Sequence, residues 1–249
     1  MNEVIETILN HRSIRKFEDK PLTQFQIEKL IASAQAASTS SYIQAYSIIG
    51  VTDKEKKEKL AELSGNQAYV SENGLFLVFC ADLYRHEVIG RMEEKDLDES
   101  LESVERFMVA VVDASLAAQN AAIAAESMDL GICFIGGIRN NLTEVKKVLN
   151  TPERVIPLFG LAIGVPLKET DKKPRLPMAA VYYENEYQQD ESKIVTELEE
   201  YNRVIKQYYT DRTKGKRQDT WSEQMAKMLE RPSRMYMKEF VQSNKMNLK

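Results

Sequence analysis

The chain has 249 residues, of which 43% are hydrophobic and 29% are charged. This composition is typical of a globular protein of one large domain or two small ones, and it excludes a disordered chain. With only 10 glycines and 7 prolines, the sequence is neither collagen-like nor of low complexity. The formal net charge of −4 argues against a dedicated nucleic-acid binder, which usually carries a strongly basic domain.

The two cysteines, Cys80 and Cys133, each lie inside an apolar stretch, which predicts buried free thiols in a reducing compartment. A disulfide scaffold is therefore excluded. His11 and His86 are the only histidines, and no metal-ligand spacing of His and Cys occurs, so we expect no bound metal. The N-terminal residues show neither the basic nor the apolar region of a signal peptide, and we expect a cytoplasmic protein.

The most apolar helical stretch of the sequence covers residues 107–128. It carries Asp113, Gln119, Asn120 and Glu126, so it lacks the clean run of about 18 apolar residues that a membrane span needs. We therefore predict a central core helix and no membrane contact.

In chain order, apolar residues at helical spacing predict helices, and short apolar or β-branched runs between turn residues predict strands. Thr23 and Gln26 form a capping-box pattern, and Asp53 is placed to cap the helix after it. Gly131 is placed to end the long helix. The predicted helices cover residues 2–10, a segment after Thr23, 54–64, 98–128, 142–149, 193–209 and 221–242, and the predicted strands cover 45–51, 74–81, 132–135 and 155–163, with a candidate fifth near 180–183.

The alternation of strands and helices predicts a sheet wrapped by helices. After about residue 190 the chain changes to helices around a polar loop, residues 210–220. Residues 191–249 carry a net charge of +4, whereas residues 1–190 carry −8. We therefore divide the chain into a core of residues 1–190 and a helical C-terminal extension of residues 191–249, within one folding unit.

Several sequence patterns of catalysis are absent. There is no G-x-G-x-x-G fingerprint and no G-x-S-x-G elbow. A phosphate loop of the Walker type is also missing, because Gly136 is followed by Gly137 where that motif requires lysine. An enzyme with this sequence is therefore expected to carry its chemistry on a cofactor.

Four short segments are candidate binding sites. Residues 11–15 and 172–177 each hold at least two cations on a short or proline-stiffened loop, which suits an anion such as a phosphate. Residues 38–41 offer four consecutive hydroxyls, and the pair Gly136-Gly137 after a buried strand permits close approach of a flat ligand. Each segment alone is also compatible with a solvated loop, a turn or a linker. Together they fit a phosphorylated, flat cofactor with polar edges.

These segments, in this order, resemble the FMN-dependent nitroreductase superfamily, and most closely its oxygen-insensitive NADPH nitroreductase and flavin reductase P branch. The most specific motifs are His11-Arg-Ser-Ile-Arg15 and Lys173-Pro-Arg-Leu-Pro177, and the likeness spans nearly the whole chain. The other motifs that carry it are Ala37-Ser-Thr-Ser-Ser41 with Gln44, Gly65-Asn-Gln67, the strand Phe76–Ala81, Ala124-Ala-Glu-Ser127 with Leu130-Gly131, Ile135-Gly-Gly-Ile-Arg-Asn140, Pro157-Leu-Phe-Gly160, and Arg212 with Asp219-Thr-Trp-Ser222.

The resemblance implies an α+β fold with a central, mostly antiparallel sheet, and an intertwined homodimer with one FMN at each subunit interface. No catalytic side chain is implied, because the chemistry takes place on the flavin N5. Thr39 stands where close relatives usually have serine, which keeps the hydroxyl. Carried over by motif, the FMN-binding residues are His11, Arg12, Ser13, Arg15, Thr39, Gln67, Phe134, Ile135, Gly136, Gly137, Lys173 and Arg175.

Three further residues take roles from the resemblance. Arg212, on the basic loop of residues 212–217, matches an arginine that recognises the 2′-phosphate of NADPH in this branch. Ser41 and Arg234 match positions expected near the acceptor substrate.

The implied activity is a ping-pong oxidoreductase, in which NADPH passes a hydride to FMN and an acceptor then takes two electrons in the same place. Nitroaromatics, quinones, azo dyes and free flavin are the expected acceptors. One alternative is an FMN reductase that hands reduced flavin to a partner monooxygenase. A non-catalytic flavin binder is disfavoured because it would not need the NADPH loop, and a nucleic-acid binder because the basic extension lacks interleaved aromatic residues.

Overall fold

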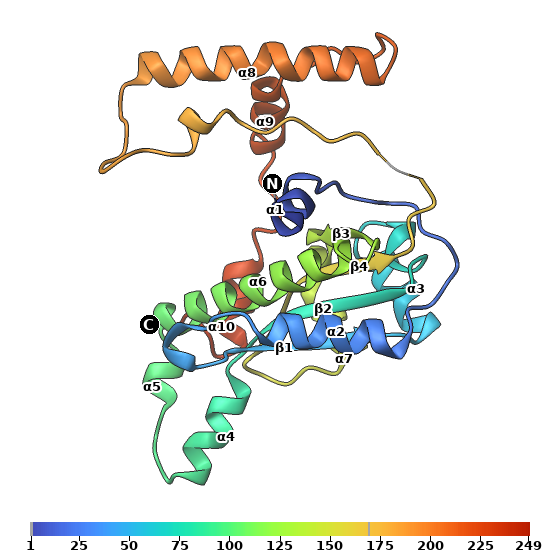
Figure 1. Cartoon of the computed structure of the whole chain (residues 1–249). Helices are drawn as coiled ribbons and strands as arrows, with labels where there is room; N and C mark the ends of the chain where they lie inside the picture. The colour runs from blue at the N-terminus through green and yellow to red at the C-terminus, as the bar shows by residue number, and fades with distance from the viewer. Residues whose placement is uncertain (1, 169) are drawn as a thin grey trace. The chain divides into compact units, whose positions relative to one another are not determined.

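The computed structural model describes residues 2–168 and 170–249 (Figure 1). The chain forms two compact units, Met1–Thr170 with Arg234–Lys249, and Asp171–Ser233. Each unit has its own hydrophobic core. The C-terminal residues thus return to the first unit after the chain has formed the second.

The first unit is built on one four-stranded sheet in which every neighbouring pair of strands is antiparallel. The two central strands, β2 and β4, are buried along nearly their whole length, as their continuous apolar sequences predict. Helices therefore cover both faces of the sheet, and the predicted helix-wrapped, mostly antiparallel sheet is confirmed. In spatial order the strands are β1 (Tyr46–Val51), β2 (Leu75–Asp82), β4 (Val155–Gly164) and β3 (Gly131–Ile135).

The helices of the first unit begin where the sequence places capping residues. Thr23 and Gln26 form the predicted capping box, and the Asp53 carboxylate accepts a hydrogen bond from Lys56 N at 2.8 Å. The α-helices are α1 (Glu3–Leu9), α2 (Gln24–Gln35), α3 (Lys54–Leu63), α4 (Tyr84–Met92), α5 (Asp98–Leu101), α6 (Val104–Glu126), α7 (Leu142–Leu149) and α10 (Met237–Ser243), and the short 3-10 helices are η1 (Ser40–Tyr42), η2 (Ala68–Val70) and η3 (Gly136–Asn140).

The longest helix of this unit, α6, packs on the sheet and on α2 (Figure 1). By length and composition alone α6 could cross a membrane, since its mean hydropathy reaches 1.5 over 18 residues. Its buried face is mostly alanine and packs into the core, which confirms the predicted core helix. Alanine allows the helix to approach the sheet closely.

The prediction of one continuous helix over residues 98–128 is wrong, because the structure has two helices there. α5 ends at Leu101, and Ser103 begins a second helix, because its extended backbone lets Oγ accept a hydrogen bond from Arg106 N at 3.2 Å.

Gly131 does not end α6, as the sequence predicted, but is the first residue of β3. Asp129 adopts the left-handed conformation after the helix instead, with a φ of 58°. A Cβ on Gly131 would lie 2.7 Å from Ile14 Cγ1, so the glycine permits the close approach of a neighbouring segment.

The second unit contains η4 (Met178–Ala180), α8 (Glu191–Arg212) and α9 (Trp221–Leu229). Its core consists of Tyr201, Ile205 and Tyr209 on one face of α8, with Leu176 and Trp221 packed against them. Apolar residues at intervals of four along α8 account for this small core.

Two predictions for this region are wrong. Residues 180–183 form no strand, because they follow a 3-10 turn and pair with no neighbouring strand among the described residues. The predicted helix of residues 221–242 is two helices, since Pro232 cannot continue α9 and Arg234 has a φ of 56°. The division at residue 190 stays a prediction, whereas the compact units divide near residues 170 and 234.

Candidate functional site

A segment near the N-terminus forms one wall of the candidate site. Ser13 bridges Ile132 of β3, and Ile14 N donates to Ile132 O at 2.8 Å. Ile14 is buried in the core, while its neighbours Ser13 and Arg15 are half-buried and exposed. The alternation of an extended segment therefore turns Ser13 and Arg15 away from the core.

His11 is held by a carboxylate at the end of α6. The distance from His11 Nδ1 to Glu126 Oε1 is 2.7 Å, and the two side chains are 29% and 13% exposed. Because an ionised carboxylate only accepts hydrogen bonds, Nδ1 carries the proton and Nε2 is the nitrogen left for a ligand. Arg12 lines a cavity of about 800 Å³ between α1 and the end of α6.

A polar cluster of Arg15, Gln67 and Tyr69 lies beside Cys133 of β3. The Tyr69 hydroxyl donates to Gln67 Oε1 at 2.7 Å. Burial raises the pKa of Tyr69, and the nearby Arg15 guanidinium offsets part of that rise. Burial also raises the pKa of the Cys133 thiol, which Arg15 and Ser13 again lower in part. Together with Ser13, the cluster thus places a cation, an amide and two hydroxyls at the edge of β3.

The pair Gly136-Gly137 begins η3 directly after β3 and closes the other side of this cluster. A Cβ on Gly137 would lie 2.3 Å from Ser64 O and 3.1 Å from Gln67 Nε2. No side chain fits there, and Gln67 is consequently held against bare backbone. The first N–H groups of a helix have no partner within it, so this backbone can donate hydrogen bonds to a ligand.

Arg234 reaches the last residue of η3. Its Nε and Nη2 donate to Asn140 Oδ1 at 3.1 and 2.9 Å. Burial lowers the pKa of Arg139, and the positive charge of Arg234 lowers it further. Arg234 therefore lies at the same end of β3 as the glycine pair.

Thr39 and Ser41 do not join this group within one chain. Asp113, in the middle of α6, binds the backbone of the hydroxyl segment, whereas Glu126 at the end of α6 binds His11. With a rise of 1.5 Å per residue, these two points of α6 are about 20 Å apart. The segment also leads into β1, at the opposite edge of the sheet from β3.

Lys173 and Arg175 belong to the second unit, so their role beside the flavin stays a prediction. Lys173 Nζ lies 5.4 Å from the centre of the Tyr209 ring, and the Arg217 guanidinium lies 3.9 Å from the same ring. The Tyr201 hydroxyl donates to Pro174 O at 2.9 Å and anchors the proline-stiffened loop on α8.

Arg212 lies in the last turn of α8 and not in the loop after it. Its guanidinium lies 5.7 Å from the centre of the Tyr208 ring and donates to the hydroxyl of that residue. Lys214 and Gly215 follow in left-handed conformations. The exposed cations thus surround the C-terminal end of α8.

Tyr69 and Glu126 are site residues that the sequence reasoning missed. Both lie next to motifs that it used: Tyr69 follows Gln67 by two residues, and Glu126 lies within the motif of residues 124–127.

The described residues fit a flat, phosphorylated group such as FMN. The Arg15 guanidinium, the Ser13 hydroxyl and the Gln67 amide can supply hydrogen bonds at the cluster, and the half-buried Gly136 lies next to Gly137, which packs against Gln67. The Phe134 ring, 39% exposed on β3, adds apolar surface. Within residues 2–168 and 170–249, no group of His, Cys, Asp or Glu side chains could hold a metal ion.

Comparison with known proteins shows the same family over the whole chain. The Nitroreductase family matches residues 8–165, and the Nitroreductase family C-terminal domain matches residues 173–249. An FMN reductase (NADPH) of Bacillus subtilis strain 168 is 54% identical to this chain, over 99% of each.

Solved structures of related proteins place the chain in the same family. The structure of B. megaterium NfrA1 has a TM-score of 0.98 and 63% identity, covering 99% of this chain and 100% of that chain. An NADPH:FMN oxidoreductase from Vibrio harveyi, complexed with NAD+, has a TM-score of 0.90 and 38% identity, covering 100% of both chains. The α+β fold is therefore the nitroreductase fold, as the motifs implied, and the chain belongs to the nitroreductase family.

Proposed function

We propose that this protein is an FMN-dependent NADPH oxidoreductase that reduces nitroaromatics, quinones or free flavin. The observation that carries the proposal is the cluster of Ser13, Arg15 and Gln67 beside the glycine pair Gly136-Gly137, in a member of the nitroreductase family. Two relatives named FMN reductase (NADPH) and NADPH:FMN oxidoreductase support it. When bound, FMN supplies the redox chemistry, because it accepts a hydride and gives up two electrons.

The chain's own residues bind and orient the cofactor. The Arg15 guanidinium offers positive charge and fork-shaped donors to a polar edge of the flavin, and Gln67 offers an amide. His11, oriented by Glu126, presents Nε2 to the phosphate. The half-buried backbone of Gly136, at the start of η3, can donate to the ring edge. Lys173 and Arg175 complete the binding set, with Phe134 and Ile135 along the ring.

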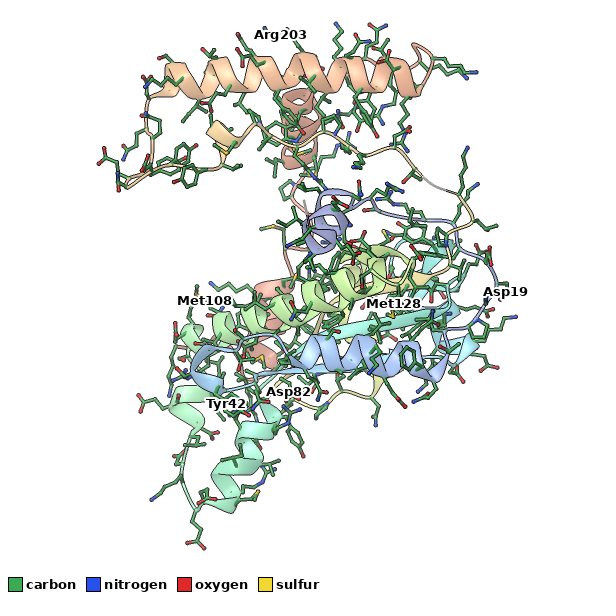
Figure 2. All side chains as sticks on the ribbon, viewed as in Figure 1. Asp19, Tyr42, Asp82, Met108, Met128 and Arg203 are labelled. Atoms are coloured by element: carbon green, nitrogen blue, oxygen red, sulfur yellow. The ribbon has the colours of Figure 1, made fainter. Side chains whose placement is uncertain are left out.

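The active form is proposed to be a homodimer in which each site takes residues from both chains. Thr39 and Ser41 are held about 20 Å from His11 along α6, so one chain cannot bring them to one cofactor. A second copy can supply them. α6 also carries a row of apolar side chains at intervals of four, which are 44–57% exposed and suit such an interface. They are Val104, Met108 (labelled in Figure 2), Val112 and Leu116.

The first experiment is the visible absorption spectrum of the purified protein before and after anaerobic addition of NADPH. A flavin band that bleaches on addition of NADPH is expected. A protein that stays colourless after incubation with FMN and removal of free FMN contradicts the proposal. A flavin band that responds to NADH but not to NADPH keeps the cofactor and removes the role of Arg212.

Arg212 is proposed to bind the 2′-phosphate of NADPH, with Arg234 and Ser41 near the acceptor. Loss of a charge-assisted hydrogen bond in Arg212→Ala is expected to raise the KM for NADPH about 10- to 100-fold. The KM values for NADH and for the acceptor should change little, because neither carries that phosphate. Arg203→Ala is the matched control, since Arg203 is exposed on the same helix and pairs with Glu200 at 4.0 Å (Figure 2). Equal effects of Arg212→Ala on NADPH and acceptor contradict the assignment.

A second candidate function is an FMN reductase that releases reduced flavin to a partner monooxygenase. The name of the Bacillus relative favours it. Release of flavin during turnover, measured by filtration of the reaction mixture, separates this activity from that of an enzyme with fixed FMN. Two buried free cysteines support a cytoplasmic location for either activity.

A further inference from the structure

The loop between α2 and β1 has a backbone that its sequence does not favour. Ser41, Tyr42 and Gln44 have φ values of 48°, 58° and 52°. Residues other than glycine rarely adopt this left-handed backbone conformation, and it persists only where surrounding contacts enforce it. The same loop carries Thr39 and Ser41, the two hydroxyls predicted to meet flavin and acceptor.

Asp113 of α6 holds this loop through its backbone N–H groups. It is fully buried and is the only charged residue on the buried face of the helix. Its Oδ1 accepts from Ser40 N and its Oδ2 from Ala45 N, each at 3.0 Å. A buried carboxylate is costly unless it is hydrogen-bonded, so the carboxylate and the loop each need the other. The two bonds bracket the left-handed residues.

The first turn of α4 holds the opposite side of the loop through its carbonyls. His86 Nε2 donates to Ile43 O at 2.8 Å, since a carbonyl only accepts. The Arg85 guanidinium donates to Gln44 O at 3.2 Å. The strained residues are thus held from α6 on one side and α4 on the other. Tyr42 lies at the loop, ahead of β1 (Figure 2).

A comparison within α6 separates this contact from ordinary packing. Asn120 of α6 also binds a backbone group outside its own helix: its Nδ2 donates a hydrogen bond to Ser33 O of α2 at 3.2 Å. Ser33 lies within the regular helix α2, which has no left-handed residue to enforce. The Asp113 contact differs from the Asn120 contact because it fixes the left-handed backbone of residues 41–44, which is unfavourable without it.

We propose that Asp113 is a positioning residue, which fixes the backbone of Thr39 and Ser41 for contact with the flavin and the acceptor. This inference rests on the proposed function. Asp113 touches neither ligand and acts through the loop. Loss of the Asp113 carboxylate therefore weakens the binding of flavin and acceptor more than the binding of NADPH, whose expected partner is Arg212.

The test compares Asp113→Asn with Asn120→Ala. The asparagine keeps the size of the side chain but turns one acceptor oxygen into a donor amide that faces a backbone N–H. In Asp113→Asn holoenzyme, diluted and assayed for free FMN by fluorescence, the Kd for FMN is expected to rise about tenfold. The KM for a quinone acceptor should rise with it, while the KM for NADPH stays near the wild-type value. Asn120→Ala should leave all three values unchanged, even where it lowers the melting temperature.

Arg85→Met keeps the test decisive if Asp113→Asn does not fold. Arg85 is exposed, and its removal loosens the carbonyl side of the same loop, so FMN and acceptor binding should weaken in the same direction. Unchanged FMN and acceptor binding in Asp113→Asn, or in Arg85→Met where Asp113→Asn does not fold, overturns the inference while the proposed function stands. An equal loss in Asn120→Ala overturns it as well. A wild-type protein that binds no FMN removes the proposed function, and this inference falls with it.

Discussion

His11 and Glu126 are separated by 115 residues of sequence and are 2.7 Å apart in space. The carboxylate fixes the orientation of the ring and the nitrogen that carries its proton. Arg15 acts in a comparable way on its neighbours, because it offsets part of the rise that burial causes in the pKa of Tyr69. At the residue scale, the polarity of the site is therefore set by pairs of side chains that are distant in sequence.

Tyr209 is expected to ionise more readily than an ordinary tyrosine. Burial alone would raise its pKa, but the cations of Lys173 and Arg217 outweigh burial and lower it. Because the folded state releases this proton more readily than the unfolded chain, the stabilisation is present above the unfolded pKa and is lost as pH falls through the folded pKa.

The measurement is the tyrosinate absorbance difference between the wild type and Tyr209→Phe during an alkaline titration. Arg217→Met should move the midpoint of this difference to higher pH, because one of the two cations is gone. Arg203→Met should leave the midpoint in place, because Arg203 lies on α8 with Tyr209 but pairs with Glu200. The same midpoint in Arg217→Met as in the wild type contradicts the proposed electrostatic cause.

At the element scale, α6 connects the separate parts of the candidate site. Its centre binds the loop before β1 through Asp113, and its C-terminal end binds the N-terminal segment through Glu126. The alanine face between these points packs on the sheet and keeps the helix in place. A rigid helix thus sets the separation of the two binding segments.

Gly137→Ala is expected to damage both stability and cofactor binding. A Cβ at this position would lie 2.3 Å from Ser64 O and would also press on Gln67, so the backbone must shift. The free energy of unfolding, measured with urea, should fall by about 1–3 kcal/mol, with weaker FMN binding. In the control Gly50→Ala the new Cβ meets Leu77 at an ordinary 3.7 Å, and little change is expected. Equal stability of the two variants would contradict the close approach at η3.

Arg154 is expected to be a main stabilising link between helices. It is buried, and its guanidinium donates to Glu87 on α4 at 3.0 Å, to Asp98 on α5 at 2.7 Å and to Lys245 O after α10 at 3.2 Å. Arg154→Met should lower the free energy of unfolding by about 3 kcal/mol, because it leaves carboxylates clustered without their cation. Arg91→Met removes an exposed pair with Glu87 and should cost less than about 1 kcal/mol. A comparable loss in the two variants, measured by urea unfolding, would refute this role.

At the scale of the whole molecule, one chain holds only part of the proposed site. Val112→Glu, in the middle of the apolar row of α6, should convert the proposed dimer to a monomer, because a charge would be buried at the interface. Sedimentation velocity measures the mass, and FMN should be lost with the dimer since Thr39 would come from the other chain. Lys56→Glu on the charged, exposed face of α3 is the control and should stay dimeric. A monomeric variant that keeps tightly bound FMN would contradict the shared site.

The local elements were largely predictable, because they depend on short-range patterns. The capping box at Thr23, the helix of residues 142–149 and the four strands agree with the sequence prediction to within one residue or two. The errors arose where one contact overrides periodicity, as at Ser103, or where proline divides an apolar pattern, as at Pro232.

The sequence by itself determined the family, the helix-wrapped sheet and most of the residue types that meet a phosphorylated flavin, because these follow from motifs and periodicity. Only the tertiary structure decided which of those residues share one chain's site. It brought His11, Ser13, Arg15 and Gln67 to the edge of β3 and held Thr39 and Ser41 at the far edge of the sheet. The physical reason is that strand order, and which segment is hydrogen-bonded to Asp113 and which to Glu126, are set by long-range packing, which no local pattern in the chain encodes.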